Sequence, residues 1–335
     1  MSEHREEEGI HSNDKGLQCP FFFLTLSTME TVIQVDNIRK RFGDLVAVDG
    51  LSFEVRRHEI FGLLGPNGAG KTTSIRMICG LLPPTKGNIQ FSKKKELKSL
   101  IGYCPQENIF YPKLTCTEQL VFIGQMYGLS SKALKRRAAE LLKLLGLHEK
   151  ANVRASKLSG GMQRRLNICL ALIHDPEILI LDEPEAGLDP QSRILVRDFV
   201  KDFGKEKAVL LTTHNMDEAD RMADRIAIID YGKLLLLDTP ENLKRTIGAG
   251  DILEIIPEDF EESRTNRFAD EMASLSMGIK TGHNSILIKH PDLINRMFEI
   301  KQMAEKAGLS ISEFKLRENT LEDVFIHLTG RNLRQ

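Results

Sequence analysis

The sequence LSGGMQ at Leu158–Gln163 lies one helical segment ahead of ILILDEP at Ile178–Pro184. A third stretch, GPNGAGKT at Gly65–Thr72, lies far upstream of both. Glycines ahead of a helix leave main-chain N–H groups open to an anion, and carboxylates directly after an apolar strand lie at the edge of a sheet. Together the three stretches predict an α/β protein with a phosphate-binding loop.

Short apolar strands alternate with helix-like segments around these motifs. Four of the strands are continuously apolar, which is typical of a parallel sheet that is covered on both faces. They are residues 60–64, 178–181, 208–212 and 226–229. We therefore expect an α/β domain built around a largely parallel sheet.

Between residues 107 and 157 the pattern changes to amphipathic helices. Glu118–Tyr127 and Lys132–Leu145 are expected to be helical, and Gly128 and Gly146 follow them as glycines do after a helix end. This pattern predicts an all-helical insert in the α/β domain.

Gly248–Gly250 form a glycine-rich hinge by composition, and the residues beyond it show a separate pattern of strand-like and helix-like segments. They predict the order β-α-β-β-α-β, which is that of a ferredoxin-like unit. The expected elements are 251–256, 263–275, 278–280, 285–289, 292–307 and 309–315. A last helix is expected from Thr320, because Thr320 and Asp323 have the spacing of a capping box. Its apolar face is formed by Leu321, Val324, Phe325 and Leu328.

The composition excludes several classes of protein. A formal charge of −1 gives no global electrostatic reason to bind nucleic acid, so no nucleic-acid partner is expected. The five cysteines form no CxxC pair, and neither a zinc site nor a disulfide framework is expected. All apolar runs are far shorter than the roughly 20 residues that cross a bilayer, so we expect no transmembrane segment.

Gly65–Thr72 fits the pattern G-x-x-x-x-G-K-[ST] in the right context, after an apolar strand and before a helix. The glycines let the backbone wrap around phosphates. Lys71 would neutralise the β- and γ-phosphates, and the Thr72 hydroxyl would ligate Mg²⁺. A purely structural glycine-rich turn would not explain Lys71 and Thr72 at these positions.

Two carboxylates follow the strand Ile178–Leu181. Asp182 closes that strand, at a position from which a carboxylate can hold the Mg²⁺ shell beside a phosphate loop. Glu183 could orient and deprotonate a water that attacks the γ-phosphate, which makes it the candidate general base. Taken alone, such a pair is more often a helix cap or a solvated edge, but the phosphate loop favours catalysis.

Residues 31 to 245 resemble the ATP-binding subunit of an ABC transporter, motif by motif and in the same order. The family carries a phosphate loop, a glutamine loop, an LSGGQ-type signature, a carboxylate dyad, a D-loop and a switch histidine. In this sequence they correspond to 65–72, Gln106, Ser159–Gln163, Asp182 with Glu183, Asp189, and His214. The resemblance implies a P-loop NTPase fold with a helical insert and an antiparallel β subdomain, and hydrolysis of ATP to ADP and phosphate.

The resemblance also implies roles for single residues. Glu183, His214 and Gln106 would be catalytic, with His214 in contact with the γ-phosphate. Thr72, Gln106 and Asp182 would hold Mg²⁺. Phe42 would stack on the adenine. The other residues expected to bind ATP are Gly65, Pro66, Asn67, Gly68, Ala69, Gly70, Lys71, Thr72, Thr73, Ser159, Gly160, Gly161 and Asp189.

Ser159–Gly161 precede a helix, so their N–H groups and hydroxyl form a second anion cradle. One chain cannot place both cradles on one phosphate. In the family the signature of one subunit closes on the ATP held by the other, which implies a head-to-tail dimer with two ATP molecules at its interface.

The sequence departs from the family pattern in three places. Met162 precedes Gln163, which should not disturb the Ser-Gly-Gly cradle. Glu185 replaces the usual small or hydroxyl residue, and we interpret it as a solvated charge at a helix start, with slower dimer closure as the alternative. The segment Gly87–Ile101 is short, so a β-hairpin of the antiparallel subdomain is expected to be trimmed there.

The ending TLEDVFIHLTGR at Thr320–Arg331 resembles that of subunits that pair with ABC-2-type permeases, a group dominated by exporters. A helix that merely packs on the ATPase domain explains the same residues. The resemblance implies a peripheral subunit at the cytoplasmic face of the cell membrane. The permease would dock on Asn108–Glu118, around Ile109, Phe110 and Tyr111 with Leu114; ordinary core packing is the alternative.

Two other classes of function fit the sequence less well. A soluble ABC ATPase of translation or DNA repair usually carries a second cassette, long coiled coils or zinc cysteines, and the sequence has none of these. A P-loop small-molecule kinase leaves the signature without a purpose. We therefore expect a disordered tail at 1–28, an ABC ATP-binding domain at 29–247 with a helical insert at 107–157, and an accessory or regulatory domain at 248–335.

Overall fold

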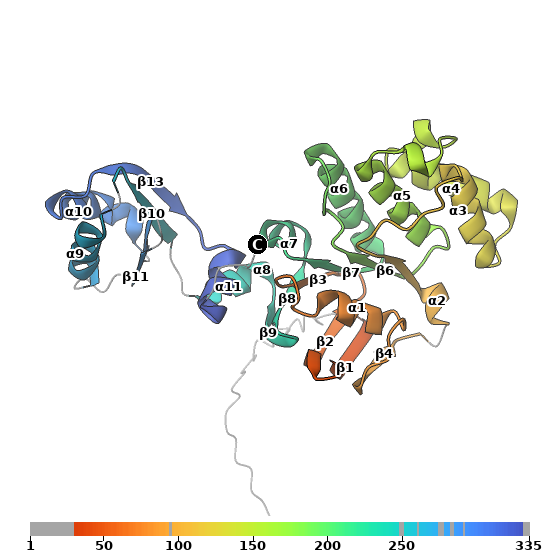
Figure 1. Cartoon of the computed structure of the whole chain (residues 1–335), viewed down its shortest axis with the longest axis horizontal. Coiled ribbons are helices and arrows are strands. Elements are labelled where there is room, and N and C mark those ends of the chain that lie inside the picture. The colour runs from red at the N-terminus through yellow and green to blue at the C-terminus, as the bar shows by residue number, and fades with distance from the viewer. Residues whose placement is uncertain are drawn as a thin grey trace, which may run out of the picture.

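The computed structural model describes residues 30–93, 96–247, 251–259, 261–273, 278–281, 285–290 and 292–330 (Figure 1). The predicted tail at 1–28 and the predicted hinge at 248–250 lie outside the described residues. The strands are β1 Thr31–Phe42, β2 Leu45–Arg56, β3 Ile60–Leu64, β4 Lys86–Phe91, β5 Ile101–Cys104, β6 Ile178–Asp182, β7 Ala208–Thr213, β8 Arg225–Asp230, β9 Lys233–Asp238, β10 Asp251–Pro257, β11 Gly278–Thr281, β12 Ile286–His290 and β13 Ile311–Arg317. The helices are α1 Lys71–Ile78, α2 Leu97–Leu100, α3 Cys116–Met126, α4 Ser131–Leu144, α5 Gly160–Leu172, α6 Pro190–Glu206, α7 Met216–Met222, α8 Pro240–Thr246, α9 Glu262–Ala273, α10 Leu293–Lys306 and α11 Leu321–Thr329.

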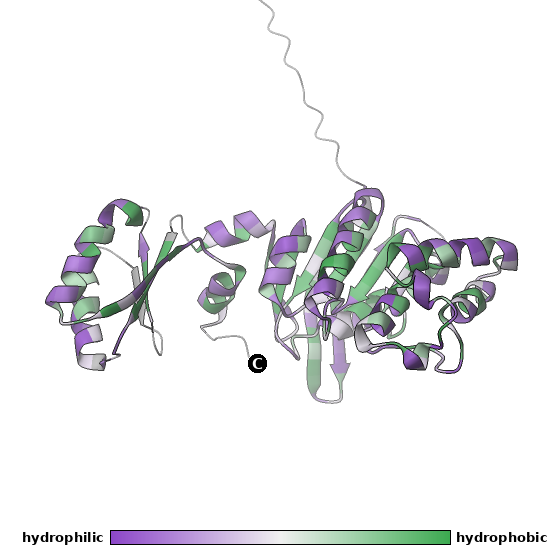
Figure 2. Ribbon diagram, turned by 90° about the horizontal axis from the view of Figure 1, so that it is seen from above, coloured by the Kyte–Doolittle hydropathy of each residue, from purple (hydrophilic) through white to green (hydrophobic). Residues whose placement is uncertain are grey.

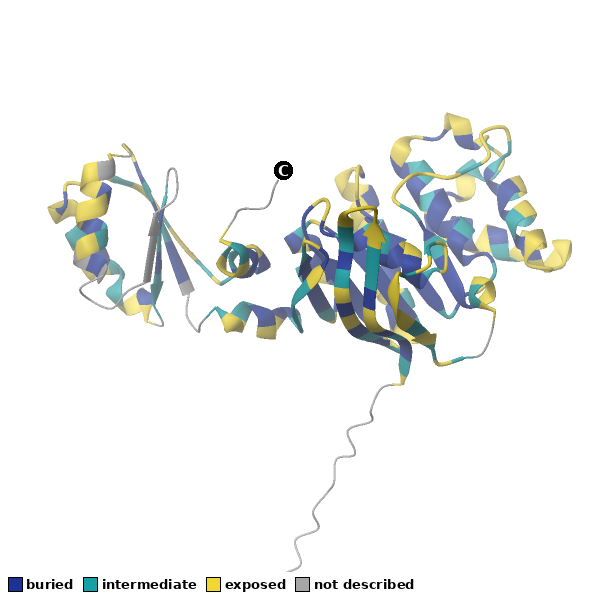
Figure 3. Ribbon diagram, turned by 60° about the horizontal axis from the view of Figure 1, so that its bottom comes forward, coloured by how far each residue is buried: buried dark blue, intermediate teal, exposed yellow. Residues whose placement is uncertain are grey.

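The central sheet has the strand order β5-β6-β7-β3-β8-β9. Its neighbours are parallel except for β9, which lies antiparallel at the edge. Every residue of β3, β6 and β7 is buried, and in Figure 3 dark blue marks the interior of the main body while yellow marks its outer surface. The parallel sheet is thus confirmed, and the four predicted strands agree with the observed ones to within one residue at each end.

A second sheet, β2-β1-β4, is antiparallel and packs with α1 against one face of the central sheet. The Phe53 ring of β2 stacks on Phe61 of β3 with ring centroids 5.0 Å apart, which joins the two sheets. Of the residues described between β4 and α2, none belongs to a strand. This agrees with the trimmed hairpin that the short Gly87–Ile101 segment predicts.

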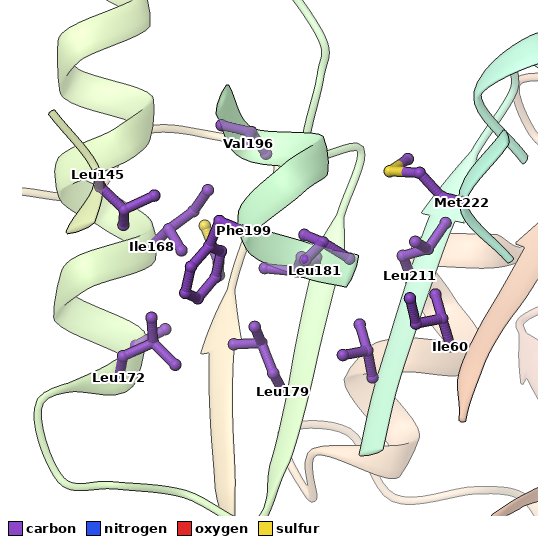
Figure 4. Close-up of a cluster of buried hydrophobic side chains, with 14 of the residues drawn as sticks. Ile60, Leu145, Ile168, Leu172, Leu179, Leu181, Val196, Phe199, Leu211 and Met222 are labelled. Carbon is purple, nitrogen blue, oxygen red and sulfur yellow. The ribbon is translucent and has the colours of Figure 1, made fainter. Parts of the chain in front are cut away.

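Helices cover the other face of the central sheet. Figure 4 shows Ile168 and Leu172 of α5, Phe199 of α6, and Leu179 and Leu181 of β6 meeting in this core. The helical insert is confirmed as α3 and α4. Both helices end at glycines with left-handed backbone, Gly128 at φ 78° and Gly146 at φ 63°, as the sequence predicts.

The C-terminal unit contains β10-α9-β11-β12-α10-β13, the predicted element order. Its sheet order is β11-β12-β10-β13 with antiparallel neighbours, and in Figure 2 both helices lie on one face of it. Assignment as a ferredoxin-like unit stays a prediction. β13 begins at Ile311 rather than Leu309, because the Leu309 N–H donates to the Ala304 carbonyl and closes the end of α10.

The last helix, α11, packs against α7 and α8 of the main body. The predicted capping box between Thr320 and Asp323 is present. Leu321, Val324 and Phe325 belong to the core beneath the central sheet's helices, whereas Leu328 is 38% exposed. The end of the chain therefore completes the core of the main body. Within the described part of the chain, no helix is both long and apolar enough to span a membrane.

Candidate active site

The loop that connects β3 to α1 has the geometry of a phosphate-binding loop. A Cβ atom at Gly65 would lie 2.3 Å from the Ile229 carbonyl oxygen, so no larger residue fits there. Gly70 caps α1 with φ 102°, a conformation that side chains other than hydrogen disfavour. The two glycines let the loop turn tightly and direct the first N–H groups of α1 toward the loop's concave side.

Lys71 lies inside this loop and is 6% exposed. Its Nζ donates to the carbonyl oxygens of Gly65 at 2.6 Å and Pro66 at 3.2 Å, and lies 3.4 Å from Oε1 of Glu183. Burial lowers the pKa of Lys71, and the carboxylates of Glu183 and Asp182 oppose that shift. A buried cation is thereby held at the centre of the loop.

Asp182 is fully buried at the end of β6. Its Oδ1 accepts from the hydroxyls of Thr212 at 2.5 Å and Thr72 at 3.3 Å. Its Oδ2 is buried and has no hydrogen-bond partner among the residues that the structure describes. A buried carboxylate oxygen is costly to leave unpaired, so this atom fits a cation ligand beside Thr72.

Glu183 is 3% exposed and has φ 54°, a left-handed backbone that is strained for a side chain of this size. Its N–H donates to the carbonyl and hydroxyl oxygens of Thr212. Its Oε2 lies 2.8 Å from Nδ1 of the half-exposed His214. Such strain concentrates at functional sites. The structure thus joins Lys71, Glu183 and His214 in one chain of contacts.

The predicted ATP-binding residues outside the phosphate loop lie elsewhere. The Ser159 hydroxyl caps α5 by accepting from the Met162 N–H, and Gly160 and Gly161 form the first turn of α5. Asp189 caps α6, and the Phe42 ring is 48% exposed at the end of β1. No hydrogen bond or ion pair in the described part of the chain joins these side chains to Lys71, Asp182 or Glu183.

Gln106 is exposed on the loop after β5. Its main-chain carbonyl accepts from the Arg164 guanidinium at 3.2 Å. Sequence reasoning missed Arg164, although a charge one helical turn before Ile168 on an apolar helix face was a usable signal. It also missed Thr212, which pairs with Asp182 across the β6–β7 register.

The interpretation of Glu185 as a solvated charge at a helix start is wrong. Glu185 is fully buried, and α6 begins only at Pro190. Its two carboxylate oxygens accept from Nε and Nη2 of Arg197 at 3.3 and 3.1 Å. A buried carboxylate needs such a partner because desolvation is costly, and no local sequence pattern indicates that Arg197 faces Glu185. The alternative effect of Glu185, slower closure of the dimer, stays a prediction.

Glu218 lies on α7, the helix that begins shortly after His214. Its Oε2 accepts from the Thr213 hydroxyl at 2.9 Å, and its N–H donates to the Asn215 side chain. Burial and the nearby Glu185 carboxylate raise the pKa of Glu218 from 4.5 to about 7. The folded protein therefore holds a proton here more tightly than the unfolded chain does.

Glu218→Gln should flatten the pH dependence of stability. Because the folded pKa is raised, the stabilisation from this proton is fully present below pH 4.5 and is lost as the pH rises through about 7. For one proton the slope of the unfolding free energy reaches at most about 1.4 kcal/mol per pH unit. Urea unfolding at a series of pH values from 4.5 to 8 measures this slope, and Glu206→Gln, at an exposed residue, is the control. Equal slopes in Glu218→Gln and the wild type would contradict this protonation.

This geometry defines a class of protein, the P-loop nucleotide hydrolases: a lysine in a glycine-rich loop, with a threonine and two strand-end carboxylates beside it. The profile of the ABC transporter family matches residues 48–186. Solved structures agree. A structure titled as the ATP-binding subunit of an ABC transporter covers 65% of this chain and 93% of its own, with a TM-score of 0.59 and 28% identity. The cbiO1 subunit of Clostridium perfringens covers 64% and 90%, with a TM-score of 0.57 and 25% identity.

Relatives match along nearly the whole chain. The linearmycin resistance ATP-binding protein LnrL of Bacillus subtilis is 37% identical over 319 residues, which is 90% of this chain and 100% of the relative. The Nod factor export ATP-binding protein I of Ralstonia nicotianae is 35% identical over 90% of this chain and 95% of its own length. The chain therefore belongs to the ATP-binding proteins of ABC transporters. It binds and hydrolyses ATP to energise such a transporter.

Proposed function

We propose that this subunit drives an ABC-2-type exporter from the cytoplasmic face of the membrane. The observation that carries the proposal is the match to relatives named for linearmycin resistance and Nod factor export, which covers 90% of this chain. The solved structure of an ATP-binding subunit covers only 65% of the chain. The proposed domains are 29–247 and 248–335, with α11 returning to the first.

Mg²⁺ is the proposed metal cofactor. The unpartnered Asp182 Oδ2 and the Thr72 hydroxyl form an oxygen-rich corner beside the phosphate loop, which fits a Mg²⁺ ion that keeps several waters. Gln106 is the proposed third protein group near the ion. When bound, Mg²⁺ would neutralise negative charge on the phosphates. Within the described ranges, no group of three or more His, Cys, Asp or Glu residues could hold a metal ion by itself.

The protein's own groups supply the remaining chemistry. Glu183, held by Lys71 on one side and by His214 on the other, is the proposed general base. The Lys71 ammonium would neutralise charge on the β- and γ-phosphates. His214, half-exposed beside Glu183, would contact the γ-phosphate. Phe42 would stack on the adenine, since its ring is exposed at the end of β1.

The proposed active form is a head-to-tail dimer. Gly160 is exposed, and a Cβ atom there would meet nothing within 4 Å, so the first turn of α5 presents open N–H groups to an incoming phosphate. Asp189 and Ser159 would lie at the same dimer interface. This arrangement would place the signature of one chain on the ATP of the other.

A cleft of about 610 Å³ is the proposed docking site for the permease. Ile109, Phe110 and Tyr111 line it together with Tyr103 of β5 and Ile123 of α3. The side chains of Ile109 and Tyr111 are 65% and 45% exposed, which ordinary core packing does not explain. Leu114, predicted to contribute, lies outside the lining.

Affinity purification of the tagged chain from membranes tests the proposal. A multi-span membrane protein should accompany the wild type, and Ile109→Asp should lower its recovery by about tenfold or more, because a charge would be buried at the interface. Leu144→Asp, at an exposed leucine outside the cleft, is the matched control. Recovery of ribosomes or DNA in place of a membrane protein would contradict a transport function.

A further inference from the structure

One buried guanidinium joins the signature helix to both catalytic loops. Arg164 lies in the second turn of α5 and is 2% exposed. From the loop after β6 it meets the carbonyl oxygens of Asp182 at 2.6 Å, Glu183 at 3.1 Å and Pro184 at 3.4 Å. From the loop after β5 it meets those of Gln106 at 3.2 Å and Pro105.

All of these acceptors are main-chain oxygens. Five N–H donors in a rigid planar fork match several carbonyls at once, which the point charge of a lysine cannot do. A buried guanidinium without partners would be costly, as would the buried carbonyls that it satisfies. Arg164 therefore fixes the path of the backbone in both loops relative to α5, whatever side chains the loops carry.

A second contact repeats this link one turn further along α5. The Asn167 side chain is 4% exposed, and its Oδ1 accepts from the Ile109 N–H at 2.9 Å. Its Nδ2 donates to the Gln163 carbonyl within α5. The loop that runs from Gln106 to the cleft is thus attached to α5 at two points, whereas the Glu183 loop is attached through Arg164.

These contacts connect parts of the molecule that serve different sites. α5 begins at the signature, which in the proposed dimer closes on the partner's ATP, while Glu183 and Gln106 serve the ATP of their own chain. We propose that Arg164 is a positioning residue that couples the two ATP sites: closure of the signature on one ATP moves α5, and Arg164 carries that movement to the Glu183 and Gln106 loops of the other site. This inference rests on the proposed head-to-tail dimer.

The test compares Arg164→Lys with Arg165→Lys in the full chain. Arg165 is a matched control, because it also donates to main-chain carbonyls, those of Leu145 and Gly146, but it contacts neither catalytic loop. ATP hydrolysis by the wild type and by Arg165→Lys should have a Hill coefficient approaching 2 for two coupled sites. Arg164→Lys should lower it to about 1 and reduce kcat by about tenfold with little change in KM.

A sizing column run with ATP distinguishes failure of the proposed dimer from failure of the coupling role of Arg164. If the hydrolysis-deficient Glu183→Gln variant forms no ATP-dependent dimer, the proposed head-to-tail dimer fails. If the dimer forms with cooperative hydrolysis and Arg164→Lys keeps the wild-type Hill coefficient, the coupling role of Arg164 is wrong. If Arg164→Lys does not fold, Arg164→Gln, which can donate to only some of the same carbonyls, takes its place and should also lower the Hill coefficient to about 1. Wild-type cooperativity in this variant would overturn the inference.

Discussion

Glu183→Gln should slow ATP turnover by more than about 100-fold while ATP still binds. Glutamine keeps the shape of the side chain and a polar contact to His214, but it cannot accept the proton of the attacking water. The Lys71 contact loses its charge pairing, yet the ammonium keeps its bonds to the Gly65 and Pro66 carbonyls. ATP should therefore remain in place and hold the dimer closed.

Phosphate release and a sizing column run with ATP measure this outcome. The variant should elute as a dimer with ATP and as a monomer without it, because hydrolysis no longer opens the interface. Glu206→Gln, at the exposed end of α6, is the control and should behave like the wild type. Wild-type turnover by Glu183→Gln would rule out Glu183 as the general base.

Linked heterodimers should show which chain's signature serves which ATP. Lys71→Ala removes the buried cation of a phosphate loop, and Gly160→Asp places a carboxylate where the partner's phosphate is expected. Space is open at Gly160, and an acidic residue suits the first turn of a helix, so the second change should fold. If both changes lie on one chain, both composite sites are damaged; if they are split, both fall on one site and the other stays intact.

The split design should therefore hydrolyse ATP at least about fivefold faster than the design with both changes on one chain. Gly160→Ala in the same two arrangements is the control, because it adds a Cβ atom without a charge. Equal rates in the two aspartate designs, or a faster rate with both changes on one chain, would contradict action of the signature in trans.

The sequence predicted those features that repeat along the chain or follow a fixed spacing. The continuous apolar runs located β3, β6, β7 and β8, and helix-ending glycines bounded α3 and α4. Contacts across the fold were not predictable in this way. Arg164 meets its acceptors only because the loops after β5 and β6 end beside α5, and Arg197 meets Glu185 only after α6 folds back over the sheet.

Glu185 illustrates the limit of local reasoning. A carboxylate beside a helix start is usually solvated, and nothing within the loop indicates that it is fully buried. By contrast, Lys71, Thr72, Asp182 and Glu183 could be placed together from the sequence. The phosphate-loop pattern follows one strand and the two carboxylates follow another, and parallel strands bring their carboxyl ends to one edge. Their roles in hydrolysis stay predictions until the variants are measured.

The position of α11 makes the main body a discontinuous domain. The chain leaves this body after α8, forms the C-terminal unit from β10 to β13, and returns with Leu321, Val324 and Phe325 to fill its core. In topological terms the C-terminal unit is therefore an insertion with both ends anchored on the ATPase, as the Lys289 ammonium bonded to the Ile247 carbonyl also reflects. A force applied to the C-terminal unit would act on the ATPase through two attachments beside α7, the helix that follows His214.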